Sequence, residues 1–206
     1  TSAELDERNN ADFREFSIED PGPVPGVYSR IESFEHEGLR DWHGDFEVPR
    51  HEVYPGVRSF WINRSGAEAY HGRHALEMFL DGTADDGTIW IERTLPVDPG
   101  TFVDVDLAFE FFRYRPDMAF FPVVSVGVLD PEREGDFVHA DFVEQGGWEM
   151  HSFQRTVFAG PYDRVHVAVG LTVSWEVPGS FFLDLVKLDA RYHTTSDPPP
   201  VPASPA

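Results

Sequence analysis

The feature that most constrains the fold of this chain is a two-residue alternation of apolar and polar side chains in short runs. Gly, Pro and Asp separate the runs, and nothing long enough repeats at helical spacing. A period of two is that of a β-strand, whose successive side chains point to opposite faces. The spacing predicts an all-β, antiparallel two-sheet sandwich with strands near residues 28–34, 57–63, 73–80, 88–95, 101–113, 123–129, 137–143, 148–158, 164–174 and 181–190.

The parity of each run separates a core side from a polar side. In residues 101–114, the odd positions from Val103 to Phe111 are apolar and predict the core side. Several large rings fall instead on the polar sides of their runs. The residues on those sides that bear on function are Trp61, Trp90, Glu92, Asp106, Glu110, Phe112, Tyr114 and His166.

The ends of the chain differ in composition from its centre. Residues 1–26 are polar and then broken by proline, which predicts an irregular arm. Residues 194–206 are rich in proline and favour an extended linker that cannot build a core. We therefore expect one sandwich domain over residues 27–193, tethered to further domains through the tail.

Charge and composition exclude several classes of function. The 206 residues carry 37 acidic and 16 basic side chains, for a net charge of −21. Such a field repels nucleic acid and anionic membranes. It is typical of a surface adapted to high salt or of an extracellular protein that collects divalent cations, and the two explanations are compatible. The absence of cysteine excludes disulfides, thiolate metal sites and thiol nucleophiles.

No membrane span or signal peptide is visible in the sequence. No stretch approaches the roughly 18 to 20 apolar residues that a span requires, and the first residues do not form a charged segment followed by an apolar one. The expected location, extracellular or at the cell surface, therefore depends on the kind of domain rather than on a targeting signal.

The stretch "DGTADDGTIW" at residues 81–90 has two readings. As an EF-hand loop it would need glycine at its sixth position, where Asp86 stands, and Glu92 at its twelfth. Glu92 belongs instead to a strongly alternating run. A connection of Asp, Gly and Thr between strands is what hairpins use, because these residues tolerate turn conformations. We expect a hairpin here.

Four segments, taken in order, resemble a known family. "SFEHEGLRDW", "RSGAEAYHGRHALEMFLDG", "TIWIERTLPVDPGTFVDVDLAFEF" and "GSFFLDLVKLDA" resemble the non-catalytic carbohydrate-binding modules with a jelly-roll, galactose-binding-domain-like fold. The similarity covers residues 28–191. It implies a jelly-roll sandwich, a structural calcium ion, and a glycan site on the concave face or in the loops at one edge.

The resemblance assigns Glu35 and Asp184 as calcium ligands, with backbone carbonyls near His71 and Gly72. Asp184 shares parity with Phe182, Val186 and Leu188 in the last strand, which predicts an inward carboxylate that needs a partner. Leu185 stands where many relatives have a second aspartate. The alternative is that Asp184 pairs with an arginine or caps backbone amides.

The candidate glycan site combines aromatic rings with polar partners. Sugars lay their CH-rich faces against rings and offer hydroxyls to acceptors, so the residues expected to bind an oligosaccharide or polysaccharide are Trp61, Trp90, Phe112 and Tyr114, with Glu92, Asp106, Glu110 and His166. The alternative is that the arm, or residues 51–56, covers these rings. The remaining tryptophans, Trp42, Trp148 and Trp175, are expected to be structural.

Catalysis is the less favoured interpretation. Glu92, Glu110 and Asp106 could supply the two acids of a glycoside hydrolase, but alternating acids arise by chance in so acidic a chain. No HExxH, GxSxG or phosphate-binding loop is present. The expectation is a non-catalytic carbohydrate-binding domain, or else an accessory domain of a larger secreted or surface protein with no small ligand.

Overall fold

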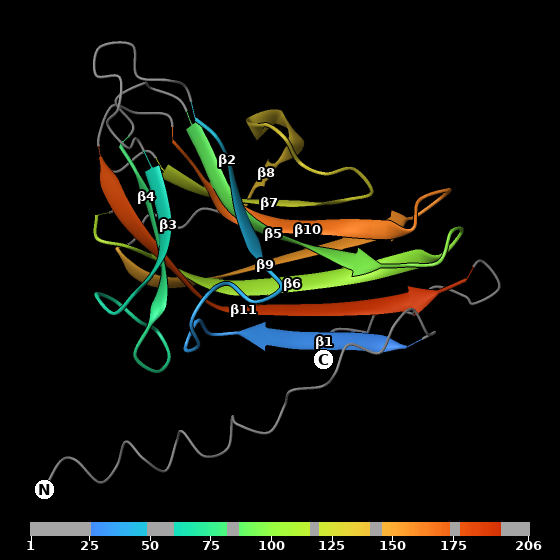
Figure 1. The fold of residues 1–206 in the computed structure, drawn as a ribbon, viewed down its shortest axis with the longest axis horizontal. Coiled ribbons are helices and arrows are strands. Elements are labelled where there is room, and N and C mark those ends of the chain that lie inside the picture. Colours follow the sequence, from blue (N-terminus) through green and yellow to red (C-terminus); the bar gives the residue numbers. More distant parts are fainter. Residues whose placement is uncertain are drawn as a thin grey trace, which may run out of the picture.

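Two antiparallel β-sheets stacked face to face make up the fold (Figure 1). The computed structural model describes residues 26–48, 60–81, 87–115, 120–140, 146–173 and 178–194. Within these ranges eleven strands form the sheets, and the one helical segment is a short 3₁₀ turn, η1 (Glu134–Asp136). The predicted all-β two-sheet sandwich is confirmed. No helix among the described residues is long and apolar enough to cross a membrane.

Sheet A has the strand order β3-β4-β11-β6-β9, and β1 pairs with β11 beside β4. The long strand β11 therefore has two partners along one edge, β4 before its midpoint and β1 after it. In Figure 1 β11 runs beside β1 and then curves upward beside β4. The strands of sheet A are β1 (Val27–Glu32), β3 (Phe60–Ser65), β4 (Ala75–Leu80), β6 (Phe102–Arg113), β9 (Gly147–Phe158) and β11 (Gly179–His193).

Sheet B has the strand order β2-β5-β10-β7-β8. Its centre is the pair of ten-residue strands β5 and β10, which align along their whole length. The strands of sheet B are β2 (His43–Glu47), β5 (Gly87–Pro96), β7 (Phe120–Gly127), β8 (Val138–His139) and β10 (Arg164–Val173).

The core lies between the sheets and follows the predicted parity. The odd residues of β6 from Val103 to Phe111 are buried, and the odd residues of β10 from Val165 to Val173 face them from sheet B. Ring contacts join the layers, since Phe181 of β11 lies 4.4 Å, centroid to centroid, from Phe120 of β7. Such continuous burial of large apolar side chains is the main stabilising term of the fold.

A β-bulge in β11 overturns the predicted orientation of Asp184. The pairing with β6 shifts register between Asp184 and Lys187, and Leu185 has a positive φ of 45°. One extra residue there reverses the parity of the strand. Val186 and Leu188 consequently face the core, whereas Asp184 points to the outer face of sheet A with Phe182. The prediction that Asp184 shares the inward side with Val186 and Leu188 is therefore wrong.

Two other local predictions differ from the structure. The edge strand β2 was not predicted, because all five of its residues are exposed and none marks a core side. Strands β4 and β5 were expected to form a hairpin around residues 81–87. They lie in different sheets, so this segment connects the two layers instead.

Several predicted features lie outside the described residues. They are most of the arm at residues 1–25, the segment 49–59 that includes the possible cover at 51–56, Trp175, and most of the tail. Whether the arm covers a face of the sandwich therefore stays a prediction. The described strands extend from Val27 to His193.

Candidate functional site

Aromatic side chains gather on the outer face of sheet A, at the end where β3 and β4 lie. The register places Trp61 beside Phe79 in one row across the sheet. In the next row Phe182, Phe112 and Trp148 are consecutive neighbours from β11 to β9. We call this surface the aromatic face, and its rings are Trp61, Tyr70, Phe79, Phe112, Tyr114, Trp148 and Phe182.

The rings of the aromatic face contact one another. Trp61 stacks on Phe79 with centroids 3.7 Å apart and an interplanar angle of 8°. Phe112 lies 5.2 Å from Trp148 and 5.0 Å, edge to face, from Tyr114. These separations are typical of favourable aromatic pairs. The rings thus support each other while part of their surface stays open to solvent.

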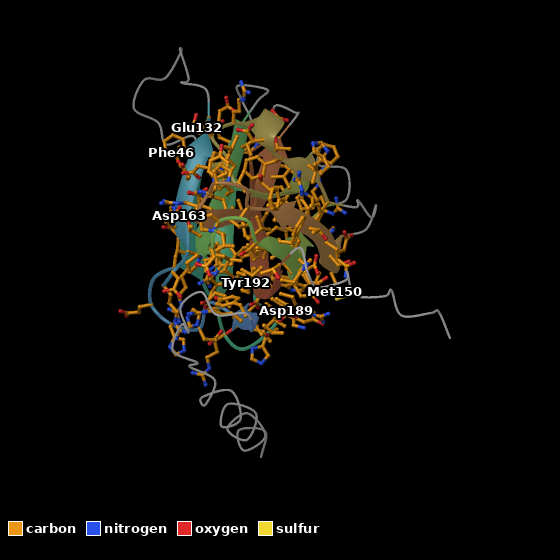
Figure 2. All side chains as sticks on the ribbon, turned by 90° about the vertical axis from the view of Figure 1, so that its right-hand side faces the viewer. Phe46, Glu132, Met150, Asp163, Asp189 and Tyr192 are labelled. Atoms are coloured by element: carbon orange, nitrogen blue, oxygen red, sulfur yellow. The ribbon has the colours of Figure 1, made fainter. Side chains whose placement is uncertain are left out.

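Exposure is greatest toward β9. Tyr114 is 54% exposed and Met150, the outward residue after Trp148, is 71% exposed. Trp61, Phe112 and Trp148 are half-buried, and Phe182 is buried. Figure 2 shows Met150 at one side of the molecule, opposite Phe46 on the edge strand β2.

The loop between β3 and β4, residues 66–74, lies against the aromatic face. Its Tyr70 ring is 5.6 Å from the ring of Trp148. Asp184 fixes this loop from below, because its Oδ2 accepts the N–H groups of Tyr70 at 3.0 Å and His71 at 2.8 Å. Through Tyr70, the loop that precedes β4 thus contacts Trp148 on β9.

Glu35 fixes the same loop from the other side. Its Oε1 accepts the N–H groups of Arg73 and His74, each at 2.8 Å. Gly72, which precedes Arg73, has a positive φ of 73°, and a Cβ there would lie 2.5 Å from that oxygen. Glycine is therefore required by both the backbone and the carboxylate. Four of the five amides from Tyr70 to His74 are thus held by two acids distant in sequence.

The two acids respond differently to burial. Asp184 is fully buried, and burial raises its pKa to about 6 although three backbone N–H groups oppose the shift. Burial also acts to raise the pKa of Glu35, but the amides of Arg73 and His74 outweigh it and lower that pKa. The direction of each pKa shift depends on whether the loss of solvent around the carboxylate outweighs the amide hydrogen bonds that it accepts.

Glu110 lies beside the rings and is only 9% exposed. Its cross-strand neighbours are Asp184 and Met150. Among the described residues no hydrogen bond or ion pair reaches its carboxyl group, and burial raises its pKa. Tyr114 also has a raised pKa, because of burial and then the neighbouring acids Glu68 and Glu77. Acids thus border the aromatic face.

The outer face of sheet B is built differently. Trp90 of β5 points outward but is fully buried, in a cluster with Val123, Phe137 and Ala168. Phe137, which follows η1, lies 5.0 Å from the Trp90 ring. The segment between β7 and β8 therefore covers this tryptophan and removes it from solvent.

Glu92 and His166 have partners on the same covered face. Glu92 accepts the Trp90 indole N–H at 3.1 Å, and its other oxygen lies 2.7 Å from His43 Nε2. Burial and the charge of Asp130 raise the pKa of Glu92 against these two groups. His166 lies 3.3 Å from Asp130, and burial lowers its pKa. Glu92 therefore has partners at both oxygens, whereas the His166 ring has, among the described residues, only the contact with Asp130.

The position of Trp90 depends on the strand beside it. Gly170 of β10 pairs with Trp90, and a Cβ at this glycine would lie 2.6 Å from the Trp90 Cα atom and would also overlap the carbonyl oxygen of Ile89. Since backbone cannot yield as a flexible side chain can, Gly170 permits the close approach of β5 and β10 under the ring.

The structure divides the eight predicted glycan residues between opposite faces. The outer face of sheet A carries Trp61, Asp106, Glu110, Phe112 and Tyr114, and that of sheet B carries Trp90, Glu92 and His166. The idea of one platform containing both Trp61 and Trp90 is therefore wrong, and burial leaves no open Trp90 ring for stacking. Parity alone cannot tell which of two sheets a strand joins.

Four rings of the aromatic face were missed from the sequence. Trp148 was expected to be structural and Phe182 to face the core with Asp184, whereas Phe79 and Tyr70 were not considered. Phe79 and Trp148 had the right signal, since both lie on the polar side of an alternating run. The bulge in β11 puts Phe182 on the outer face although its parity matches that of the core residues Val186 and Leu188. Tyr70 lies in a loop, where no alternation of side chains can be read. Trp42 is buried, as expected.

The predicted carboxylate pairs for glycoside hydrolysis do not form. Glu92 is on the opposite face from Glu110 and Asp106. Asp106 and Glu110 share a face of β6, but four residues of extended strand separate them by roughly 13 Å. Two acids need roughly 5 to 10 Å for this chemistry.

The oxygens assigned to calcium are engaged by amides. Glu35 and Asp184 do converge on the loop around His71 and Gly72, but they meet N–H groups there rather than the oxygen shell that calcium requires. Among the described residues no group of three acids or histidines is arranged to hold a metal ion. The donor set therefore does not fit calcium in this arrangement. It matches the alternative in which Asp184 caps backbone amides.

No protein-family model and no curated protein matches the chain. Among solved structures, a cyclase from Fischerella sp. TAU aligns with a TM-score of 0.51 and 14% identity over 81% of this chain and 98% of the cyclase. The C-terminal family 22 carbohydrate-binding module of Clostridium thermocellum Xyn10B aligns at 0.47 and 16% identity, over 85% of this chain and 99% of the module.

A third similar structure is the enzymatically active domain of bacteriophage CBA120 tailspike protein 4, with a TM-score of 0.48 and 10% identity. It matches 75% of this chain, which spans 20% of the tailspike chain. The likeness to the cyclase shows the sandwich fold. One fold can carry unrelated functions, so function has to be argued from the site.

Proposed function

We propose that this domain binds a glycan on the aromatic face and does so without catalysis. The observation that carries the proposal is the row of half-buried rings that remains open on the outside of sheet A. Partly exposed rings held rigidly by their neighbours lose little conformational freedom when a ligand covers them. The CH faces of a sugar fit such rings, and the bordering acids accept hydrogen bonds from its hydroxyls.

The layout suits an extended chain of sugars. Trp148, Tyr114 and Met150 offer the most open apolar surface at the β6–β9 side, and Trp61 with Phe79 lies across the sheet on β3 and β4. Strands lie about 4.8 Å apart, so the four spacings from β3 to β9 amount to about 19 Å. Several sugar units, rather than one, would be needed to reach from end to end.

Binding of oligosaccharides to Tyr114→Ala and Trp148→Ala tests the proposal. Removing one stacking ring should weaken binding of the best ligand from a glycan array by about tenfold or more, at roughly 1–2 kcal/mol for each ring. Calorimetric titration gives the dissociation constants. Tyr162→Ala is the matched control, because Tyr162 is 42% exposed in the turn between β9 and β10, away from the aromatic face.

The outcomes separate clearly. Loss in Tyr114→Ala and Trp148→Ala with wild-type affinity in Tyr162→Ala supports the aromatic face as the binding site. If the wild-type domain binds no glycan on the array at low or high salt, the proposal fails. Equal effects of all three substitutions would move the site elsewhere.

A structural calcium ion stays a prediction at Glu35 and Asp184, and binding would require the two carboxylates to exchange amide donors for the ion. Calcium that binds only the folded state raises its stability by mass action. The melting temperature with millimolar calcium should then exceed that with chelator, and Glu35→Gln should abolish the difference. Melting that is indifferent to the chelator removes calcium from the proposal.

We further propose that the domain works outside the cell, attached to other domains through its proline-rich tail. Glycans that present extended chains are met mainly there, and a cysteine-free acidic domain needs no reducing compartment. Fractionation of the native host, with an antibody to this domain, tests the location. Finding the protein only in the cytosol would contradict it.

A further inference from the structure

The charges that border the aromatic face are all of one sign on the strands. The outward residues of β3, β4, β6 and the first half of β11 include Glu77, Asp106 and Glu110 but no lysine or arginine. Lys187, the first basic residue beyond the bulge, is engaged by Asp189 at 2.8 Å. The exposed arginines nearest in sequence, Arg73 and Arg115, are in loops. The strand surface under the rings is therefore negative.

Within this negative surface, Glu110 is the position at which a positively charged group would bind. Glu110 as a residue is 9% exposed, on the same face of β6 as Phe112, and within the described part of the chain its carboxyl group has no hydrogen-bond or ion-pair partner. A buried carboxylate without donors is costly. The other strongly buried acids have donors: Asp184 has three amides, Glu92 has the indole of Trp90 with His43 beside it, and Glu32 has the amide of Phe34 at one of its two oxygens. No described residue supplies such a donor to Glu110, which leaves its carboxylate available to a donor on a ligand.

We infer, on the basis of the proposed function, that the glycan bound at the aromatic face carries free, positively charged amines. An ammonium group would lie against Glu110, with Glu77 as the next acid on β4, while the sugar ring stacks on Tyr114 or Trp148. Aromatic faces also attract cations, so the rings and the acids act in the same sense. Uronic or sulfated glycans are excluded by repulsion.

Neutral hydroxyls could also donate to Glu110, so the comparison of amine with neutral ligand decides the class. A hydrogen bond to a charged partner contributes more than one between neutral groups. We therefore expect the amine form of a glycan to bind about tenfold more tightly than its matched neutral form. Because the attraction acts between charges, added salt should reduce the preference.

The test uses matched oligosaccharides in gluco and galacto configurations, each as the free amine, the N-acetylated amine, the plain hydroxyl form and the uronic acid. Binding is measured by calorimetry in slightly acidic, low-salt buffer, in which the amines are protonated. Amine forms should bind most tightly and uronic acids least. Glu110→Gln should bring the ratio of amine to acetylated affinity close to one, whatever the change in the two absolute affinities, because the substitution removes the negative charge.

Two controls keep the result interpretable. Glu132→Gln removes the same charge from the exposed segment over sheet B, where Figure 2 shows Glu132 near Phe46 and away from Met150, and should leave the preference intact. Glu77→Gln replaces Glu110→Gln if the latter melts early, and should lower the preference by severalfold. Neutral or uronic forms that bind as tightly as the amines overturn the inference but leave glycan binding in place. No binding by any oligosaccharide overturns both.

Discussion

The two outer faces of the sandwich carry similar residues but differ in how far the connecting segments cover them. Each has a tryptophan, acids and alternating strands, yet Trp90 on sheet B is buried under Phe137, whereas Trp148 on sheet A is half open. On sheet B the polar groups pair with one another. On sheet A the β3–β4 loop covers Asp184 but leaves Tyr114 and part of Trp148 open, and Glu110 has no partner among the described residues. The connecting segments, not the strands, decide which face can receive a ligand.

The largest expected effect separates the two tryptophans by stability. Trp90→Ala should lower the free energy of unfolding by about 3–5 kcal/mol, because it empties a fully enclosed site. Trp148→Ala should cost less than half as much, since part of its ring is already in water. Urea denaturation of both variants measures the difference. Equal losses would mean that the two faces are enclosed to the same degree, and the comparison would break.

The acid beneath the aromatic face should make stability depend on pH. The pKa of Asp184 is about 6 in the folded protein and ordinary when unfolded, so the folded state binds more protons between roughly pH 4 and 6. Stability from this group is therefore full below pH 4 and is lost as pH rises toward 6, by up to about 3 kcal/mol. Asp184→Asn should flatten that slope.

The measurement is urea denaturation at several pH values in the absence of divalent cations. A second arm with calcium sharpens the comparison, because an ion at Asp184 would favour the ionised form and reverse the slope. Glu92, whose pKa is also raised, contributes a slope of the same sign from the other face. An unchanged slope in Asp184→Asn would contradict the assignment to Asp184.

The smallest expected effect concerns the open ring of Tyr114. Tyr114→Ala should change the free energy of unfolding by no more than about 0.5 kcal/mol, because a side chain that is 54% exposed contributes little packing. Its phenol should titrate above the usual range, since burial and the neighbouring acids raise its pKa. Spectrophotometric titration against the variant isolates that phenol. A normal value would place Tyr114 away from Glu68 and Glu77.

The sequence was sufficient for the fold because the alternation is strong in strands that are buried on one side. Phe60, Val103 and Val165 begin runs whose parity the structure repeats, and each of the ten predicted strands has a counterpart. The strand β2 escaped because its five exposed residues carry no periodic signal. The alternation of apolar and polar residues therefore identifies strands that are solvent-exposed on one face and fails for strands that are exposed on both.

The site was less accessible to sequence reasoning for three physical reasons. Alternation assigns Trp61 and Trp90 to outer faces but does not say that these faces belong to different sheets. It also cannot foresee that Phe137, far along the chain, would cover Trp90 while Trp148 stays open. Asp184 shows the third difficulty, since one residue in a left-handed conformation reverses the orientation that parity predicts.

The bulge at Leu185 changes which residues of the last strand face the core. Upstream of it the odd residues face the core, and downstream the even ones do. Because Leu185 is the extra residue, deleting it would leave a regular strand in which Leu183, Val186 and Leu188 still face the core and Lys187 still faces water. A one-residue deletion elsewhere in the strand would instead turn one part of it over, so the bulge marks the position where the last strand can change its length without exchanging its two faces.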